Sequence, residues 1–301
     1  MTATNATAPG QNIFVDLAEY MTELESTTSG VRQVVEVGVA SAFLQVVMGI
    51  DWCRRNIRPV ATPDKWIQNR LRSDATNTSW IIHFHRIIKL ADAFFTLLHS
   101  QADGFDVLRN RFHARPTKPC FIEAQIASLQ AANGFKVEIV GESGLRGRDF
   151  DLTARRDGIV LNIEVTSKDE IPLSAKTVRN TLKSKRTQLP TTGPAILYMH
   201  IPANWMQDKK AAQAIFSEAF SDVFSRSRRF NAVVLIWEYV MATPVGGTSN
   251  VELWPCYNNN ARHQFDRELL DLPLDADGRP RFANSFYDFL KGVQARHTHK
   301  S

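Results

Sequence analysis

The sequence predicts a mixed α/β protein in which helices flank a central β-sheet, preceded by a helical N-terminal region. Three observations predict this class. Apolar residues recur at helical spacing up to about residue 115, helix and strand patterns then alternate up to Thr243, and a hairpin signal, Asp157-Gly158, joins two strands. We therefore expect a helical region at 1–115, an α/β core at 116–243 and a partly irregular C-terminal extension at 244–301.

The N-terminal region carries the apolar stripes of amphipathic helices. Stripes of this kind are formed by Phe14, Leu17, Met21 and Leu24, and by Ile87, Leu90, Phe94 and Leu97. Thr62-Pro63-Asp64 predicts a break between helices, and the two prolines within 115–119 predict the end of the region, because proline resists continuation of a helix.

The core changes repeatedly between helical and strand periodicity. The expected elements are a helix at 121–133, strands at 135–140, 150–154 and 159–165, a helix at 174–188, a strand at 195–201, a helix at 209–225 and a strand at 232–240. Gly134 and Ser174 occupy capping positions of the first two helices. Beyond Thr243 the pattern is weak, and we expect loops at 258–260 and 275–280 and a short helix at 286–293.

Composition limits the partners and the compartment. Lys and Arg number 36 against 31 Asp and Glu, and the segment 171–190, with five basic and no acidic residues, matches the whole excess of +5. The three cysteines form no CxxC pair, which argues against a zinc finger or a disulfide framework and favours the cytoplasm. No uncharged apolar run reaches the ~18 residues of a membrane span, so we expect no membrane partner.

Two carboxylates on neighbouring strands are expected to converge. Strand side chains alternate between two faces, so Asp151 and Glu164 both lie opposite the apolar face of their strands, and the hairpin makes those strands neighbours. The two carboxylates repel each other unless a cation lies between them. A bound Mg²⁺ or Mn²⁺ takes both as oxygen ligands and can activate water against a phosphodiester.

Asp151, followed by Glu164-Val165-Thr166-Ser167-Lys168, resembles the motif of the PD-(D/E)XK phosphodiesterase superfamily, which has the restriction-endonuclease-like fold. The resemblance covers about residues 118–240 and includes the order of the elements. It implies that Asp151, Glu164 and the carbonyl of Val165 bind the metal ion. It also implies that Glu123, on the helix before the strands, completes the shell directly or through water.

The motif departs from the family pattern at its lysine. Thr166 stands where the lysine usually follows the glutamate, and Lys168 lies about 6–7 Å farther along the same strand face. We assign Lys168 the role of orienting the attacking water, with Lys183 and Lys185 as less favoured substitutes. Asp149 is expected to be structural, with replacement of Asp151 as its alternative role.

The helix at 174–188 presents a basic face suited to a phosphate backbone. Lys176, Arg179, Lys183 and Arg186 share this face, and Val178 and Leu182 lie on the opposite, packing side. Gln188 resembles a polar residue that some nuclease subfamilies carry on this helix. We therefore expect a nucleic-acid partner, DNA in the first place.

These observations predict a Mg²⁺- or Mn²⁺-dependent nuclease that hydrolyses phosphodiester bonds in DNA. The alternative is a catalytically inactive protein of the same fold that binds nucleic acid or serves assembly, which Thr166 favours. Scattered carboxylates, or a Lys168 amine turned away from them, would favour this alternative. A third hypothesis places the function in oligomerisation through the helical N-terminal region, which also offers a surface for a homodimer.

Overall fold

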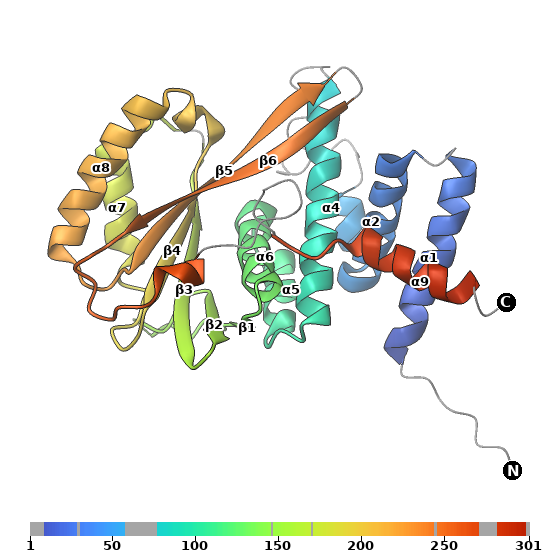
Figure 1. Ribbon diagram of the computed structural model, residues 1–301, viewed down its shortest axis with the longest axis horizontal. Helices are drawn as coiled ribbons and strands as arrows, with labels where there is room; N and C mark the ends of the chain where they lie inside the picture. The colour runs from blue at the N-terminus through green and yellow to red at the C-terminus, as the bar shows by residue number, and fades with distance from the viewer. Residues whose placement is uncertain are drawn as a thin grey trace, which may run out of the picture.

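The computed structural model describes residues 9–28, 31–57, 77–145, 147–169, 171–243, 246–270 and 282–298. The expected break at 62–64 and the expected loop at 275–280 lie outside these ranges. Within them, one mixed sheet is flanked by helices, which confirms the predicted α/β class (Figure 1).

The sheet has six strands in the described part of the chain, and their order in space follows the sequence. Strands β1 to β3 and the pair β5–β6 are antiparallel, whereas β3, β4 and β5 are parallel neighbours. The strands are β1 (Lys136–Ile139), β2 (Leu152–Arg156), β3 (Ile159–Ser167), β4 (Ala195–His200), β5 (Ala232–Thr243) and β6 (Gly246–Tyr257).

Helices cover both faces of the sheet. Helices α7 and α8 cover one face, α6 and α4 lie against the other, and α1, α2 and α9 lie beyond α4 (Figure 1). The helices are α1 (Pro9–Thr27), α2 (Arg32–Met48), α3 (Ile50–Asn56), α4 (Asn77–His99), α5 (Phe105–Ala114), α6 (Thr117–Ala132), α7 (Ala175–Lys185), α8 (Lys209–Arg226) and α9 (Phe286–Thr298), with short 3₁₀ helices at Ala203–Met206 and Arg267–Leu270. None of these described helices combines the length and apolar character needed to cross a membrane.

Alternation along the strands assigns each side chain to a layer. Ile163 and its β4 partner Ile196 belong to the core beneath α6, whereas Leu197 belongs to the core beneath α7 and α8. Glu164 pairs in register with Leu197 and therefore points toward the α7 layer. This places an acidic side chain on the same face as Leu197, which is fully buried.

The N-terminal helices share one hydrophobic core with the α6 face of the sheet and with α9. The ring of Phe14 lies 5.2 Å from that of Phe289, and the indole N–H of Trp52 donates to the carbonyl of Phe112 at 3.0 Å. Helices α1 and α9, the first and last of the described chain, are thus packed together.

The elements of the core follow the predicted order, with small shifts at their ends. The hydroxyl of Ser174 accepts the N–H of Thr177 at 3.1 Å, which confirms the predicted cap of α7. Helix α6 begins at Thr117, before the expected start, because Pro119 lies in the first turn, where a missing N–H removes no intrahelical bond.

The structure adds one strand that the sequence did not predict. Strand β6 pairs with β5 along its whole length, although it lies in the partly irregular extension where the pattern is weak and no strand was expected. Polar Asn250 and Glu252 interrupt its apolar pattern, and Pro255 is tolerated because β6 is an edge strand. Expected loop residues 258–260 do form a turn, and α9 continues beyond the expected end of the C-terminal helix to Thr298.

Candidate active site

A cavity of about 460 Å³, here called the acidic cavity, opens where β2 begins and β3 ends. It is lined by carboxylates from three separate segments and by cations from two helices and the α5–α6 connection. The charged side chains that line it are Glu123, Glu142, Asp149, Asp151, Glu164, Arg111, Arg115 and Lys185, and Gln188 also contributes. Thus Glu123, Asp151 and Glu164, which the sequence nominated, reach the same cavity.

The β-hairpin places Asp151 beside Glu164. Leu152 pairs with Ile163, so the residue before Leu152 lies opposite the residue after Ile163. Asp151 Oδ2 accepts the backbone N–H of Val165 at 2.8 Å, which fixes the orientation of the carboxylate. The N–H and C=O of one strand residue point to the same side, so the Val165 carbonyl faces the same edge of β3, beyond the first residue of β2.

Glu164 is the most deeply buried of the site carboxylates, with 1% of its side chain exposed. Its Oε1 lies 2.5 Å from Lys185 Nζ, whereas its buried Oε2 has no hydrogen-bond partner in the described part of the chain. Burial and the nearby charge of Asp151 raise the pKa of Glu164 to about 8, although Lys185 opposes this shift. An unsatisfied buried carboxylate oxygen is costly, and a bound cation is one means of satisfying it.

Glu123 is held by a buried arginine of α5. Arg111 Nη1 donates to Glu123 Oε2 at 2.9 Å and lies 3.7 Å from Asp151 Oδ1, and the other end of the guanidinium donates to the Val140 carbonyl. Burial and the charge of Asp151 raise the pKa of Glu123 to about 7. Burial likewise raises the pKa of Asp151. The three carboxylates therefore form one electrostatically coupled group.

The carboxylates do not form a closed metal cage. In the ranges that the structure describes, no three His, Cys, Asp or Glu side chains lie close enough to surround a metal ion. The guanidinium of Arg111 contacts both Glu123 and Asp151, so it supplies positive charge between these two carboxylates. Glu164 Oε2 is buried without a hydrogen bond from the described chain, and Asp151 Oδ1 has the 3.7 Å ion pair with Arg111. Mg²⁺ commonly takes only one or two carboxylates and keeps several waters, so this donor set fits it.

The structure brings Lys185, rather than Lys168, to the carboxylates. Lys168 lies just past the end of β3, where its N–H donates to the His200 carbonyl and its own carbonyl accepts from Lys118 Nζ. The side chain of Lys168 is not among those that line the acidic cavity. Burial and the charge of Lys185 lower the pKa of Lys168.

Asp149 accepts hydrogen bonds that hold the loop before β2. Its Oδ1 accepts the N–H and the hydroxyl of Ser143, both at 2.7 Å, and the N–H of Gly144 at 3.1 Å. These bonds lower the pKa of Asp149. The structural role expected for this residue agrees with these contacts.

The basic face of α7 is only partly free. Arg179 lies 2.9 Å from Glu218 and 3.9 Å from Asp222 of α8, so it holds the two helices together. Lys176 and Lys183 are exposed, Arg186 is partly exposed, and Val178 and Leu182 are buried as expected. The sequence suggested an uninterrupted basic surface because the α8 acids are distant along the chain.

Sequence reasoning missed Arg111 and Arg115 and ranked Lys185 below Lys168. A signal for Arg111 does exist, since it lies in the buried stripe of α5 beside Leu108 and Phe112. A cation in such a stripe requires a buried anion as partner. No comparable signal marks Arg115, which pairs with Glu142 from the loop after β1.

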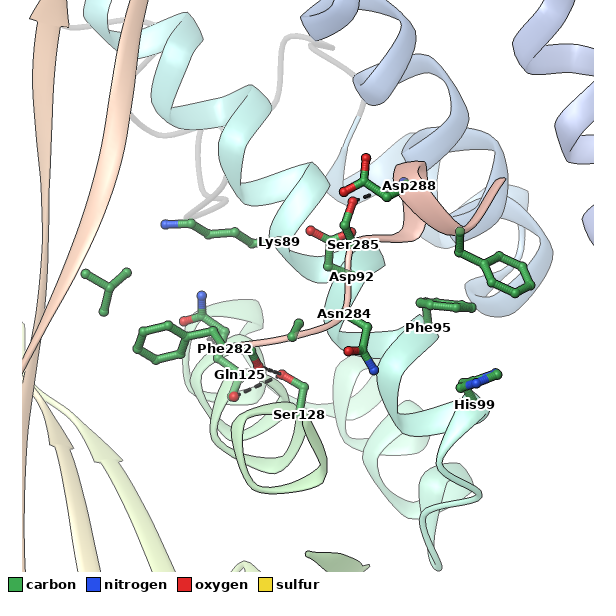
Figure 2. A pocket seen from close by; sticks show the side chains of 13 residues that line it. Lys89, Asp92, Phe95, His99, Gln125, Ser128, Phe282, Asn284, Ser285 and Asp288 are labelled. Atoms are coloured by element: carbon green, nitrogen blue, oxygen red, sulfur yellow. Dashed lines mark hydrogen bonds between the residues drawn. The ribbon is translucent and has the colours of Figure 1, made fainter. Parts of the chain in front are cut away.

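A further cavity lies where the C-terminal segment is attached to the helices. Its volume is about 690 Å³, and it lies between α4, α6 and the segment leading into α9 (Figure 2). Asp92 Oδ1 accepts the N–H of Phe286 at 2.8 Å, and the Ser128 hydroxyl donates to the Phe282 carbonyl at 2.9 Å. These polar groups attach the C-terminal segment to the helices. We call this space the α9 cavity.

Comparisons with protein-family models, with curated proteins and with solved structures find no match to this chain. The candidate site therefore stands on the convergence of its own side chains.

Proposed function

We propose that this protein is a metal-dependent nuclease with a restriction-endonuclease-like core, which hydrolyses phosphodiester bonds, in DNA in the first place. The observation that carries the proposal is the convergence of Asp151 and Glu164 on one cavity, with the buried Oε2 of Glu164 left without a partner among the described residues. The order α6, β1, β2, β3, α7, β4 supports the same assignment.

Asp151, Glu164 and the carbonyl of Val165 would hold Mg²⁺ or Mn²⁺, with Glu123 reaching the shell through water. When bound, the ion would lower the pKa of water and stabilise charge on the phosphate.

The remaining roles belong to side chains already in place. Lys185 Nζ contacts Glu164 Oε1, and 24% of the Lys185 side chain is exposed. The amine can therefore orient the attacking water or stabilise negative charge on the phosphate. Glu123 can accept a proton near neutral pH, because its pKa is raised to about 7. Arg111 positions Glu123 through its 2.9 Å contact. The role assigned to Lys168 from the sequence thus passes to Lys185 in this proposal.

A cleavage assay tests the proposal. Purified protein is incubated with duplex DNA, single-stranded DNA and RNA in Mg²⁺, in Mn²⁺ and in EDTA. We expect metal-dependent cleavage that Asp151→Ala and Glu164→Ala abolish. Asp51→Ala is the matched control, because Asp51 is exposed on α3, outside the cavity. Absence of cleavage by the wild-type protein, or unchanged cleavage by Asp151→Ala, would refute the proposal.

The inactive nucleic-acid-binding protein is the second candidate. Two observations favour it: Arg111 and Lys185 already neutralise the carboxylates, and Lys168 does not line the cavity. Binding of DNA without cleavage in either metal would support this candidate.

The homodimer remains a prediction. Tyr20, Val34, Val46 and Ile50 are exposed on helices α1 to α3, where a second copy could cover them. Light scattering of the full chain measures the oligomeric state directly.

A further inference from the structure

A third cavity, of about 400 Å³, is basic. Five arginines and one histidine line it, and none of its lining residues is acidic. We call it the arginine pocket; its charged members are Arg186, Arg226, Arg228, Arg229, Arg262 and His263. Like charges gathered around one cavity repel each other, so the arrangement is relieved when an anion enters.

Hydrogen bonds tie together the three segments that form the pocket. The guanidinium of Arg229 donates to the carbonyls of Arg186 and Leu189 at 3.0 and 3.2 Å, which fixes the turn after α7. The backbone N–H of Arg262 donates to the Arg228 carbonyl at 2.8 Å, and His263 Nε2 lies 2.8 Å from the Thr191 carbonyl. The segments after α7, α8 and β6 therefore form a fixed frame.

The arginines of the pocket divide into structural and available cations. Arg229 is used by the frame, and Arg226 lies 3.0 Å from Asp222. For Arg186, Arg228 and Arg262, no carboxylate of the described chain forms an ion pair. Arg228 and Arg262 are exposed, so three guanidinium groups remain for a ligand.

We propose that the arginine pocket binds a backbone phosphate of a nucleic acid strand. Guanidinium groups match phosphate oxygens with two parallel hydrogen bonds, and positively charged contacts of this kind supply the affinity of proteins for nucleic acid. The choice of a polymer as ligand rests on the proposed function, because the pocket adjoins the acidic cavity. Lys185 reaches Glu164 in that cavity, while its neighbour Arg186 lines the pocket.

The short distance along the chain between the two cavities suggests how the arginine pocket would serve the acidic cavity. Gln188 lines the acidic cavity and Pro190 lines the arginine pocket, so one short turn after α7 separates them. The N–H of Gly147, from the loop beside the acidic cavity, donates to Thr187 of this turn at 3.1 Å. A strand bound in the pocket would therefore have a neighbouring phosphodiester directed toward the carboxylates.

A binding experiment without catalysis tests the pocket. Fluorescence anisotropy of labelled duplex and single-stranded DNA is measured in EDTA, over a range of salt concentrations, for the wild type and for Arg228→Ala/Arg262→Ala. The control is Arg54→Ala/Arg55→Ala, which removes the same charge from α3. Thermal melting checks that each variant is folded.

We expect the pocket variant to bind DNA at least about tenfold more weakly. For duplex DNA its salt slope should fall by about 2, since each phosphate contact contributes about 0.9. The control should bind like the wild type. Equal binding by the two double variants, or no DNA binding by the wild type, would overturn the inference. A third outcome would also overturn it: inorganic phosphate or a mononucleotide raises the melting temperature through these arginines, while the pocket variant still binds DNA as the wild type does.

Failure of the pocket and failure of the nuclease proposal are separable. If the wild type cleaves DNA but the pocket variant binds as well as the control, only the pocket inference fails. If the wild type cleaves nothing and the pocket variant still loses DNA binding, the phosphate site stands and the catalytic proposal fails.

Discussion

Two cavities of this protein are lined by carboxylates with a raised pKa, and their oxygens are engaged in different ways. In the α9 cavity, Asp92 accepts the N–H of Phe286 at the first residue of α9. In the acidic cavity, Glu164 Oε2 is buried without a partner in the described chain, and two other carboxylates lie close enough to affect its charge state. Burial raises the pKa of Asp92 to about 7 and that of Glu164 to about 8.

The difference teaches that a raised pKa does not by itself identify a reaction site. Asp92 completes a helix terminus, where a carboxylate is stabilised by unpaired N–H groups. Glu36 and Asp288 also raise the pKa of Asp92, but Asp92 keeps the N–H of Phe286 as a partner. Glu164 lies beside Asp151 and its buried Oε2 has no partner in the described chain, an arrangement that costs stability unless a ligand uses it. The α9 cavity is the larger of the two, so cavity volume and the proposed site of reaction point to different places.

The largest expected effect is a difference in cleavage rate between a variant of the acidic cavity and a variant of the α9 cavity. Asp151→Asn should lower metal-dependent cleavage by about 10³-fold, because loss of a metal ligand removes several kcal/mol of charge stabilisation. Asp92→Asn should leave the rate within about threefold, since the proposed function places the chemistry in the acidic cavity. Initial cleavage rates measure both variants, and a comparable loss in Asp92→Asn would remove the distinction.

A smaller loss should separate two lysines at the acidic cavity. Lys185→Met should lower cleavage by about 10²-fold, because its amine contacts Glu164, whereas Lys168→Met should change it by less than about fivefold. Single-turnover rates at saturating enzyme exclude effects on binding. A larger loss in Lys168→Met would restore the role that the sequence suggested for Lys168.

Lys168 and Lys185 also show which parts of the site can be predicted from the sequence. Strand alternation and the Asp157-Gly158 hairpin suffice to place Asp151 opposite Glu164, because both rules act over a few residues. The order of the core elements follows from local periodicity in the same way. Choosing between Lys168 and Lys185 requires the path of the chain between β3 and α7, which no local pattern specifies.

Long-range packing explains the other omissions. Arg111 belongs to a helix of the N-terminal region, yet its guanidinium lies between carboxylates from α6 and the start of β2. Strand β6 is half polar and is specified by its pairing with β5, so its own pattern is weak. The arginine pocket combines residues from three distant segments, each of which alone resembles an ordinary solvated surface.

The stability of the metal-free protein gives a third contrast. Asp92→Ala should lower the free energy of unfolding by about 2 kcal/mol, because the buried N–H of Phe286 loses its acceptor. Glu164→Gln should raise it by about 1–3 kcal/mol at pH 8, because the glutamine is neutral and Lys185, partly exposed, can turn toward solvent. Urea unfolding in EDTA measures both. A destabilised Glu164→Gln would mean that the ion pair with Lys185 outweighs the burial of the charge.

The smallest expected effect is a dependence of stability on pH, and it again separates the cavities. Glu123 and Glu164 have an ordinary pKa of 4.5, raised in the folded protein to about 7 and about 8. Between these values the folded state binds more protons than the unfolded state, so the free energy of unfolding falls as pH rises from about 5 to about 8. Asp92 contributes in the same direction.

Each of Asp92→Asn and Glu164→Gln should therefore reduce this slope, by at most about 1.4 kcal/mol per pH unit. Mn²⁺ distinguishes the two contributions. At pH 8 it should raise the melting temperature of the wild type and of Asp92→Asn, because their site carboxylates remain intact, and it should have little effect on Glu164→Gln. Equal stabilisation of both variants by Mn²⁺ would place the ion outside the acidic cavity, and the carboxylate pair would then have to be explained as a buried network without a metal.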